Sequence, residues 1–129
     1  MRISITYAAL NDLNICGCDI QNAYLQAPSS KKHYIICGPE FGLENVGRKA
    51  IIVRAFYGGK SAGADYWRNV IKAMNEMGFQ SCKADPDIWS HPATHPDGTE
   101  CWQYILLYTD DILAVMEEPE NFIHEELGM

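Results

Sequence analysis

Several features that mark common protein classes are missing from this sequence of 129 residues. No apolar run approaches the roughly eighteen residues that cross a bilayer, so we expect no membrane segment. The first ten residues lack the apolar core and small-residue cleavage site of a secretory signal, which favours a cytoplasmic or nuclear location. There is neither an internal repeat nor a low-complexity stretch, which excludes repeat architectures.

Paired cysteines are also missing. The five cysteines are an odd number and include no C-x-x-C spacing, which excludes a regular disulfide framework and a structural zinc site. We therefore expect free thiols. Cys16 and Cys18 are two residues apart in a predicted strand, so their side chains share one face and pack as small apolar groups.

Basic residues are scarce. The chain has 10 lysines and arginines against 17 acidic residues, a net charge of -7 and a pI near 4.9. Such a balance is unusual for an enzyme that acts on nucleic acid, because a basic surface normally holds the phosphates. If the chain does act on nucleic acid, we expect the basic surface in other parts of a longer protein.

The pattern that is present predicts one α+β domain. Apolar residues recur at helical spacing in one long segment that ends at Gly78, and β-favouring or continuous apolar runs occur elsewhere. The predicted helices cover 2–11, 61–77 and 119–127, and the predicted strands lie near 13–20, 33–37, 51–53, 88–89, 104–108 and 112–116.

Two adjacent acidic residues, Asp110 and Asp111, stand between the apolar runs 104–108 and 112–116. These runs predict two buried strands joined by a tight turn, with the acidic pair at its tip. An Asp pair at a turn is most often only a solvated loop. Here the two carboxylates would repel unless a cation lies between them, and Mg²⁺ prefers such oxygen ligands.

A third aspartate, Asp19, ends the predicted strand 13–20. A lone Asp at a strand end is commonly a cap, but Gly17 lies on the same face and leaves it bare, as expected where a ligand approaches. Asp19 and the pair at Asp110 are about 90 residues apart in the chain. Pairing of their strands in an antiparallel sheet would bring them together.

The residues carry a resemblance to a known family. In the segment 17–25, Asp19 is followed five residues later by Tyr24, and Tyr108 to Asp111 read Y-T-D-D. Further elements are Tyr34–Ile35 with Gly38–Gly42, Phe56–Ala64 with Tyr66–Trp67, Gly78–Phe79 and Ala84–Trp89. In these elements and in their order, the chain resembles over nearly its whole length the reverse transcriptase of copia-type (pseudovirus) LTR retrotransposons, whose Y-x-D-D box usually has Val where Thr109 stands.

The resemblance implies a palm-like antiparallel sheet with helices on one face, formed by a partial reverse transcriptase domain over 1–129 with part of the fingers at about 28–60. It implies RNA-directed DNA polymerase activity by two-metal nucleotidyl transfer with Mg²⁺, or Mn²⁺ in its place. The implied partners are an RNA or DNA template with its primer, deoxynucleoside triphosphates and the rest of the Pol polyprotein, namely fingers, thumb, ribonuclease H and integrase. The implied location is the cytoplasm, including virus-like particles, or the nucleus, and the isolated segment is expected to be inactive.

The resemblance also implies residue roles. Asp19 and Asp110 would bind both metals and Asp111 would support them, which makes these three the catalytic residues. Residues Ile20, Asn22, Ala23 and Tyr24 would contact the nucleotide, with Tyr24 beneath the incoming sugar. On the template side, the expected residues are Tyr57, Gly58 and Lys60.

Simpler interpretations remain open. Tyr24 is also consistent with an ordinary core tyrosine, and Lys60 with a solvated charge. The chain is also consistent with an inactive transposon-derived remnant that folds without catalysis. An unrelated Mg²⁺-dependent phosphotransfer or sugar-nucleotide enzyme is disfavoured by the ordered elements between the acidic motifs.

Overall fold

The computed structural model describes residues 2–125. The chain forms two compact units. One, the sheet unit, comprises Met1–Gln21 and Ala73–Met129, and the other, the ribbon unit, comprises Asn22–Lys72. That the whole chain is one domain with finger-like residues at about 28–60 stays a prediction.

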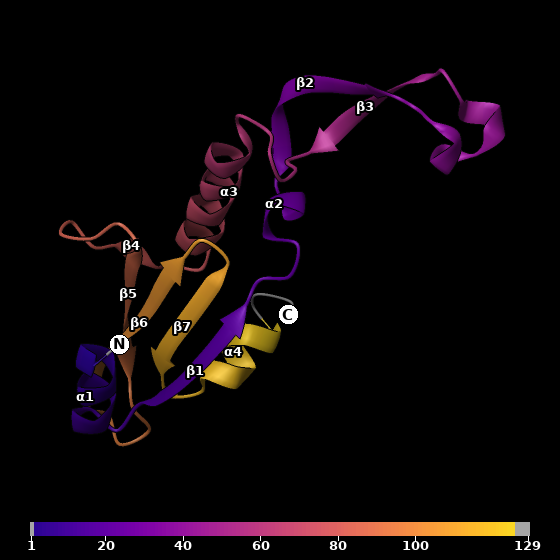
Figure 1. The fold of residues 1–129 in the computed structure, drawn as a ribbon. Helices are drawn as coiled ribbons and strands as arrows, with labels where there is room; N and C mark the ends of the chain where they lie inside the picture. The colour runs from indigo at the N-terminus through magenta and orange to yellow at the C-terminus, as the bar shows by residue number, and fades with distance from the viewer. Residues whose placement is uncertain (1, 126–129) are drawn as a thin grey trace. The chain divides into compact units, whose positions relative to one another are not determined.

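The sheet unit is built on a five-stranded antiparallel sheet in the order β1-β7-β6-β5-β4 (Figure 1). Its strands are β1 (Asn14–Asp19), β4 (Gln80–Ser81), β5 (Ile88–Thr94), β6 (Glu100–Tyr108) and β7 (Asp111–Met116). The central strands β6 and β7 contain the two continuous apolar runs. Ile105 of β6 and Ala114 of β7, which lie opposite each other, are both 0% exposed, as expected for the packed face of an antiparallel sheet.

Two helices cover opposite faces of this sheet. On one face, Tyr7 of α1 (Arg2–Leu10) makes an edge contact with Tyr104, at 5.1 Å between ring centroids. On the other, Phe122 of α4 (Pro119–Glu125) contacts Phe79, whose ring lies 5.2 Å from that of His91. Figure 1 shows α4 alongside β1, and α4 contacts both β1 and β7. The expectation of helices on one face is therefore wrong for α1, because its apolar side buries part of the face that carries Tyr104.

The ribbon unit contains a two-stranded antiparallel ribbon of β2 (Pro28–Ile36) and β3 (Lys49–Arg54), with a register irregularity between Pro28 and His33. A short helix α2 (Ala23–Gln26) precedes it, and the two 3-10 turns η1 (Pro39–Phe41) and η2 (Leu43–Asn45) join its strands. The long helix α3 (Ala62–Glu76) follows; it belongs to the ribbon unit up to Lys72 and to the sheet unit from Ala73.

The predicted helical stop is confirmed. Gly78 has a φ of 83°, and the amide of Phe79 donates to the carbonyl of Met74 at 2.9 Å. That bond satisfies one of the carbonyls left free at a helix end, and the positive φ suits glycine. Of the predicted helix at 119–127, the last two residues lie outside the described residues. Among those described, no helix combines the length and the apolar character needed to cross a bilayer.

Asp65 fixes α3 to the start of β2 inside the ribbon unit. Its side chain is fully buried, and its carboxylate accepts the amide of Ser30 at 3.0 Å and a guanidinium N–H of Arg68 at 3.2 Å. Hydrogen bonds from the side chain and backbone of Ser30 lower the pKa of Asp65 to about 2, with help from Ser61 and Arg68. The ionised carboxylate therefore stabilises the folded ribbon unit.

Asp65→Asn is expected to destabilise the protein at neutral pH. Because folding lowers the pKa of Asp65, its contribution is present above the pKa of the unfolded chain and is lost as the pH falls toward 2. The difference in thermal unfolding temperature between parent and variant should thus shrink from pH 7 to pH 2.5. Arg68→Ala should have little effect, because the Arg68 side chain is 65% exposed and such pairs contribute little. An undiminished difference at pH 2.5 would show that the charge of Asp65 is not what stabilises the unit.

Candidate functional site: an acidic pair at the end of a groove

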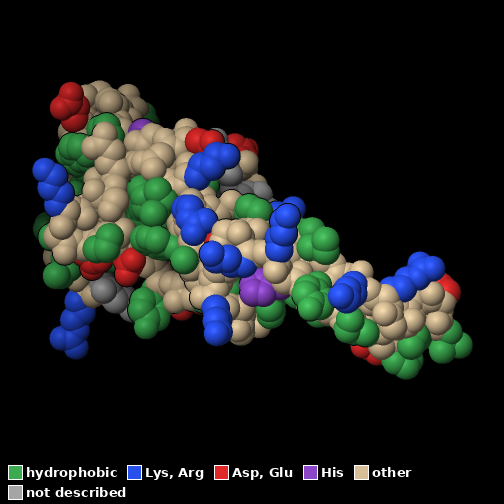
Figure 2. Space-filling view, turned by 90° about the horizontal axis from the view of Figure 1, so that it is seen from above, with side chains coloured by type: hydrophobic (Ala, Val, Ile, Leu, Met, Phe, Trp, Pro, Cys, Tyr) green, Lys and Arg blue, Asp and Glu red, His purple; other side chains and the backbone are tan. Residues whose placement is uncertain are grey.

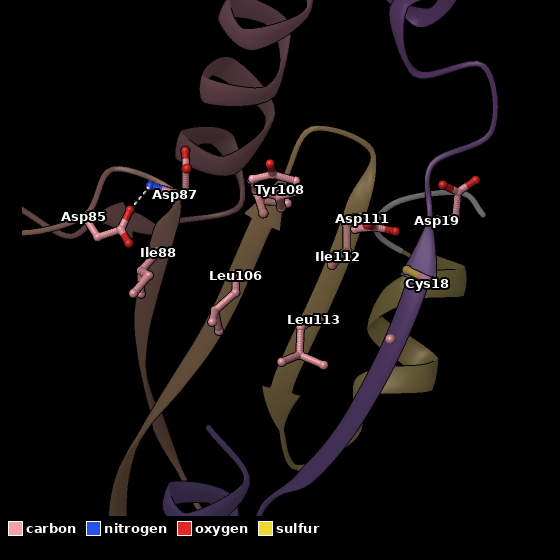
Figure 3. A pocket seen from close by; sticks show the side chains of 12 residues that line it. Cys18, Asp19, Asp85, Asp87, Ile88, Leu106, Tyr108, Asp111, Ile112 and Leu113 are labelled. Atoms are coloured by element: carbon pink, nitrogen blue, oxygen red, sulfur yellow. Dashed lines mark hydrogen bonds between the residues drawn. The ribbon is translucent and has the colours of Figure 1, made fainter. Parts of the chain in front are cut away.

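The antiparallel pairing of β1 with β7 places the predicted acidic residues together. In the register, Asp19 lies directly opposite Asp111, and Asp111 lies opposite Tyr108 on its other side. Residues opposite each other in a sheet project from the same face, about 5 Å apart at their β-carbons. Figure 3 shows the Asp111 side chain extending toward β1, which carries Asp19 at its end.

Asp110 belongs to the same corner through its backbone. It forms with Thr109 the two-residue turn between β6 and β7, and its carbonyl accepts the amide of Ile20 at 2.7 Å. This bond holds the end of β1 against the turn. The bond also occupies the Ile20 N–H, so of the backbone polar groups of Ile20 only the carbonyl remains for the predicted contact with the nucleotide.

Thr109 has an unfavourable backbone conformation, with a φ of 56°. Glycine or asparagine normally occupies such a turn position, whereas a β-branched residue with positive φ is an outlier. Strained residues of this kind cluster at functional sites, where the surrounding structure maintains them. The strain therefore adds an independent indication that the Thr109–Asp110 turn has a function.

The donor set fits a hard divalent cation. Asp19 and Asp111 are exposed, and ionised carboxylates directly opposite each other destabilise a sheet unless a cation or water separates them. Within residues 2–125, no three or more His, Cys, Asp and Glu side chains form a ready-made metal cage. Mg²⁺ does not need one, because it is usually held by one or two carboxylates together with waters and phosphates.

Asp19 and Asp111, which form the acidic pair of this site, stand at one end of an open groove of about 690 Å³ on this face of the sheet. Leu113, Leu106 and Ile88 form its floor as a cross-strand row, and Gly17 continues this row onto β1. Figure 3 shows the three apolar side chains along neighbouring strands, with the acidic residues nearer the strand ends. The groove thus combines oxygen ligands with an apolar floor.

Two further carboxylates line the groove, and sequence reasoning did not identify them as site residues. Asp85 and Asp87 precede β5, and the Asp85 carboxylate accepts the amide of Asp87 at 3.0 Å. The floor residues Leu106 and Leu113 were also missed. Alternation would have found them, since both share a strand face with the hairpin-tip residues Tyr108 and Asp111.

The remaining predicted residues belong to the ribbon unit. Tyr24 is half-buried and makes edge contacts with Tyr57 and Tyr66, with ring centroids 4.7 and 5.5 Å away. Predicted nucleotide-side and template-side residues therefore meet in one aromatic cluster. Asn22 is exposed in a left-handed conformation, whereas Ala23 is 0% exposed, so neither its side chain nor its backbone is open to a ligand in this structure.

The predicted template-side segment is a turn. Gly58 has a φ of 87°, which suits glycine, and a β-carbon there would meet nothing within 4 Å. Tyr57 and Lys60 are exposed on either side of it. The segment is thus accessible, as contact with a ligand requires.

None of the protein-family models, curated proteins or solved structures compared with the chain matches it. The structure itself shows a small α+β architecture with an antiparallel sheet and helices. The resemblance to copia-type reverse transcriptases rests on the motif residues alone.

Proposed function

We propose that this chain is the palm segment of a copia-type reverse transcriptase, an RNA-directed DNA polymerase that transfers nucleotides with two Mg²⁺ ions. One observation carries the proposal: Asp19 lies opposite Asp111, beside the turn that contains Asp110, at the end of an open groove. The three aspartates of the matched motifs come from segments about 90 residues apart. Chance motif matches give no reason for such a convergence.

The residues have distinct roles in the proposed mechanism. Asp19 and Asp110 supply the carboxylates that hold the two ions, and Asp111 supports them from β7. When bound, the ions lower the pKa of the primer 3′-hydroxyl and neutralise the charge on the triphosphate. The hydrogen bond from Ile20 to Asp110 keeps the two ligand-bearing segments in register. Fixing the metal ligands relative to each other would in turn fix the positions of the reactants, and such positioning accounts for much of the rate gain in these reactions.

Tyr24 is proposed to select the sugar. A ring placed beneath the incoming ribose leaves no room for a 2′-hydroxyl, so deoxynucleotides are preferred. Its edge contacts with Tyr57 and Tyr66 would hold the ring in one orientation. The same contacts also suit a tyrosine that only packs. If Tyr24 selects the sugar, a polymerase with Tyr24→Ala should reject ribonucleotides less strongly than the parent, whereas equal rejection would mean that Tyr24 only packs.

The distribution of charge supports a nucleic-acid partner more than the net charge does. Residues 22–72 contain eight of the 10 lysines and arginines but only three of the 17 acidic residues. Figure 2 shows several lysine and arginine side chains close together on the face in view. The basic surface that we expected outside this chain is thus partly present within the ribbon unit, where it can contact phosphates.

Lys31→Ser/Lys32→Ser is expected to weaken binding of a single-stranded oligonucleotide and to reduce its salt dependence. The slope of log K against log salt should fall by about 0.7 for every phosphate of a single strand that the variant no longer neutralises. Both lysines are exposed on β2, so the fold should survive. The matched control is Arg2→Ser/Lys83→Ser, which removes the only two basic residues of the sheet unit. Equal slopes for the two double variants would exclude a specific role of the ribbon.

The proposed activity is tested by primer extension with Mg²⁺ and deoxynucleotides, using a polymerase that contains this chain. Extension that needs Mg²⁺ and the three aspartates supports the proposal. Extension unaffected by their replacement would refute it. No extension by the parent protein would favour an inactive, transposon-derived remnant.

A further inference from the structure

Gly17 lies where an added β-carbon would fit the protein, whereas a larger side chain would fill the groove. It is in the middle of β1, opposite Leu113, and it lines the groove two residues before Asp19. Two strand residues span about 7 Å, so Gly17 lies one cross-strand row below the acidic pair. The floor row is thus apolar on three strands and bare on the fourth.

The fold itself does not require glycine at this position. A β-carbon there would have only ordinary contacts, 3.8 Å from the Ile112 carbonyl oxygen and 3.9 Å from Leu113 Cδ1. The residue belongs to a regular strand and is not among those with positive φ. Glycine inside a strand weakens it, since it adds chain entropy and no packing. Something other than the stability of β1 therefore accounts for Gly17.

A ligand held at the acidic pair would need this space. A group bound at Asp19 and Asp111 through a hydroxyl, or through a phosphate with a divalent cation between the charges, can extend along the groove over the row formed by Leu113 and Leu106. A side chain at Gly17 would stand up from the sheet beside that row and narrow the groove. The apolar floor suits the face of a sugar or base ring, and the missing side chain lets the ring lie low.

We infer that Gly17 is a clearance position, kept without a side chain so that the terminal nucleoside of a strand ending at Asp19 and Asp111 can lie on the groove floor. The inference rests on the proposed function and assigns Gly17 a positioning role within it. Gly17→Val should then have opposite effects on stability and binding. The strand should become more stable, because valine favours strands, while the groove should bind its ligand less well.

The test uses this chain with methyl-labelled isoleucine and leucine, titrated with a deoxytetranucleotide in Mg²⁺ at low salt. In the parent protein, the methyl resonances of Leu106, Leu113 and Ile88 should shift as the oligonucleotide binds. Gly17→Val should lower the apparent affinity at least about tenfold and raise the thermal unfolding temperature by about 2–4 °C. The affinity and the unfolding temperature of Gly17→Ala should lie between those of the parent and those of Gly17→Val. Resonance broadening by Mn²⁺ should be equal in all three, because the carboxylates are unchanged.

Gly63→Ala is the matched control. Gly63 is exposed in α3, and a β-carbon there meets nothing within 4 Å, so this variant should gain stability without losing affinity. Unchanged affinity of Gly17→Val, or a lower unfolding temperature, would overturn the inference. Self-association of that variant with normal affinity would also overturn it, since Gly17 would then protect the exposed edge of β1. Absence of methyl shifts in the parent would overturn the proposed function together with the inference.

Discussion

Asp110→Asn is expected to reduce Mg²⁺-dependent primer extension by at least about three orders of magnitude in a polymerase that contains this chain. The substitution keeps the shape of the side chain but removes a negative oxygen ligand. Several kcal/mol of charge stabilisation are lost when a metal is misplaced, and about 1.4 kcal/mol corresponds to a tenfold change in rate. The measurement is single-turnover extension of a primed template.

The fold should survive this change. The contact of Asp110 with the rest of the corner is made by its backbone carbonyl, which asparagine retains, so the Ile20 hydrogen bond should persist. The unfolding temperature should therefore stay within roughly 2 °C of the parent value. Asp87→Asn removes the same charge from the other side of the groove and should extend primers nearly normally. If Asp87→Asn reduced primer extension as much as Asp110→Asn, the effect would come from the total charge of the groove and not from a specific metal ligand.

The convergence of the acidic residues could be predicted because the signals were strong. Continuous apolar runs on both sides of Asp110 and Asp111 leave few alternatives to a buried hairpin, and the structure confirms β6 and β7. The predicted pairing of the Asp19 strand with this hairpin is also confirmed. Neighbouring antiparallel strands are the simplest way to bury such runs, so the position of Asp19 followed from topology.

Strand lengths were harder to predict where a strand consists of polar residues and lacks apolar alternation. We expected β2 to begin near His33, but it begins at Pro28, since Ser29 to Lys32 have no apolar alternation. β5 was expected to cover only 88–89, yet it continues through Pro92 to Thr94. Proline lacks a donor and is tolerated on edge strands, and β4 pairs β5 only at Trp89 and Ser90. Pairing with β6 along the whole of β5 therefore outweighs the local signal.

The groove and the placement of α1 depend on tertiary packing, which local patterns do not encode. The spacing of residues 2–11 predicted a helix, and α1 forms, but nothing local indicated which face of the sheet it covers. Because α1 covers only part of that face, around Tyr104, the rest remains open as the groove. The open part is the part next to Asp19 and Asp111.

Asp19→Asn is expected to raise the unfolding temperature in metal-free buffer and to abolish stabilisation by Mg²⁺ or Mn²⁺. Relief of repulsion between directly opposed charges is worth about 0.2–1 kcal/mol. Since both side chains are exposed, this gain should shrink in high salt. The parent protein should show the reverse pattern, with lower stability alone and a gain when metal binds only the folded state. At tenfold excess of metal over its Kd that gain is about 1.4 kcal/mol, or roughly 4–6 °C.

Thermal unfolding of four variants with and without Mn²⁺ tests this expectation. Asp87→Asn should keep the full metal-dependent shift, because Asp87 precedes β5, three strands away from β1 in the sheet order. A shift in Asp19→Asn equal to that of the parent would exclude a metal site at the end of β1. The other two variants distinguish the ligands: loss in Asp110→Asn supports the bridging role implied by the resemblance, whereas loss only in Asp111→Asn places the metal between the directly opposed residues. In either case, the carboxylate of Asp19 is the ligand that both arrangements share.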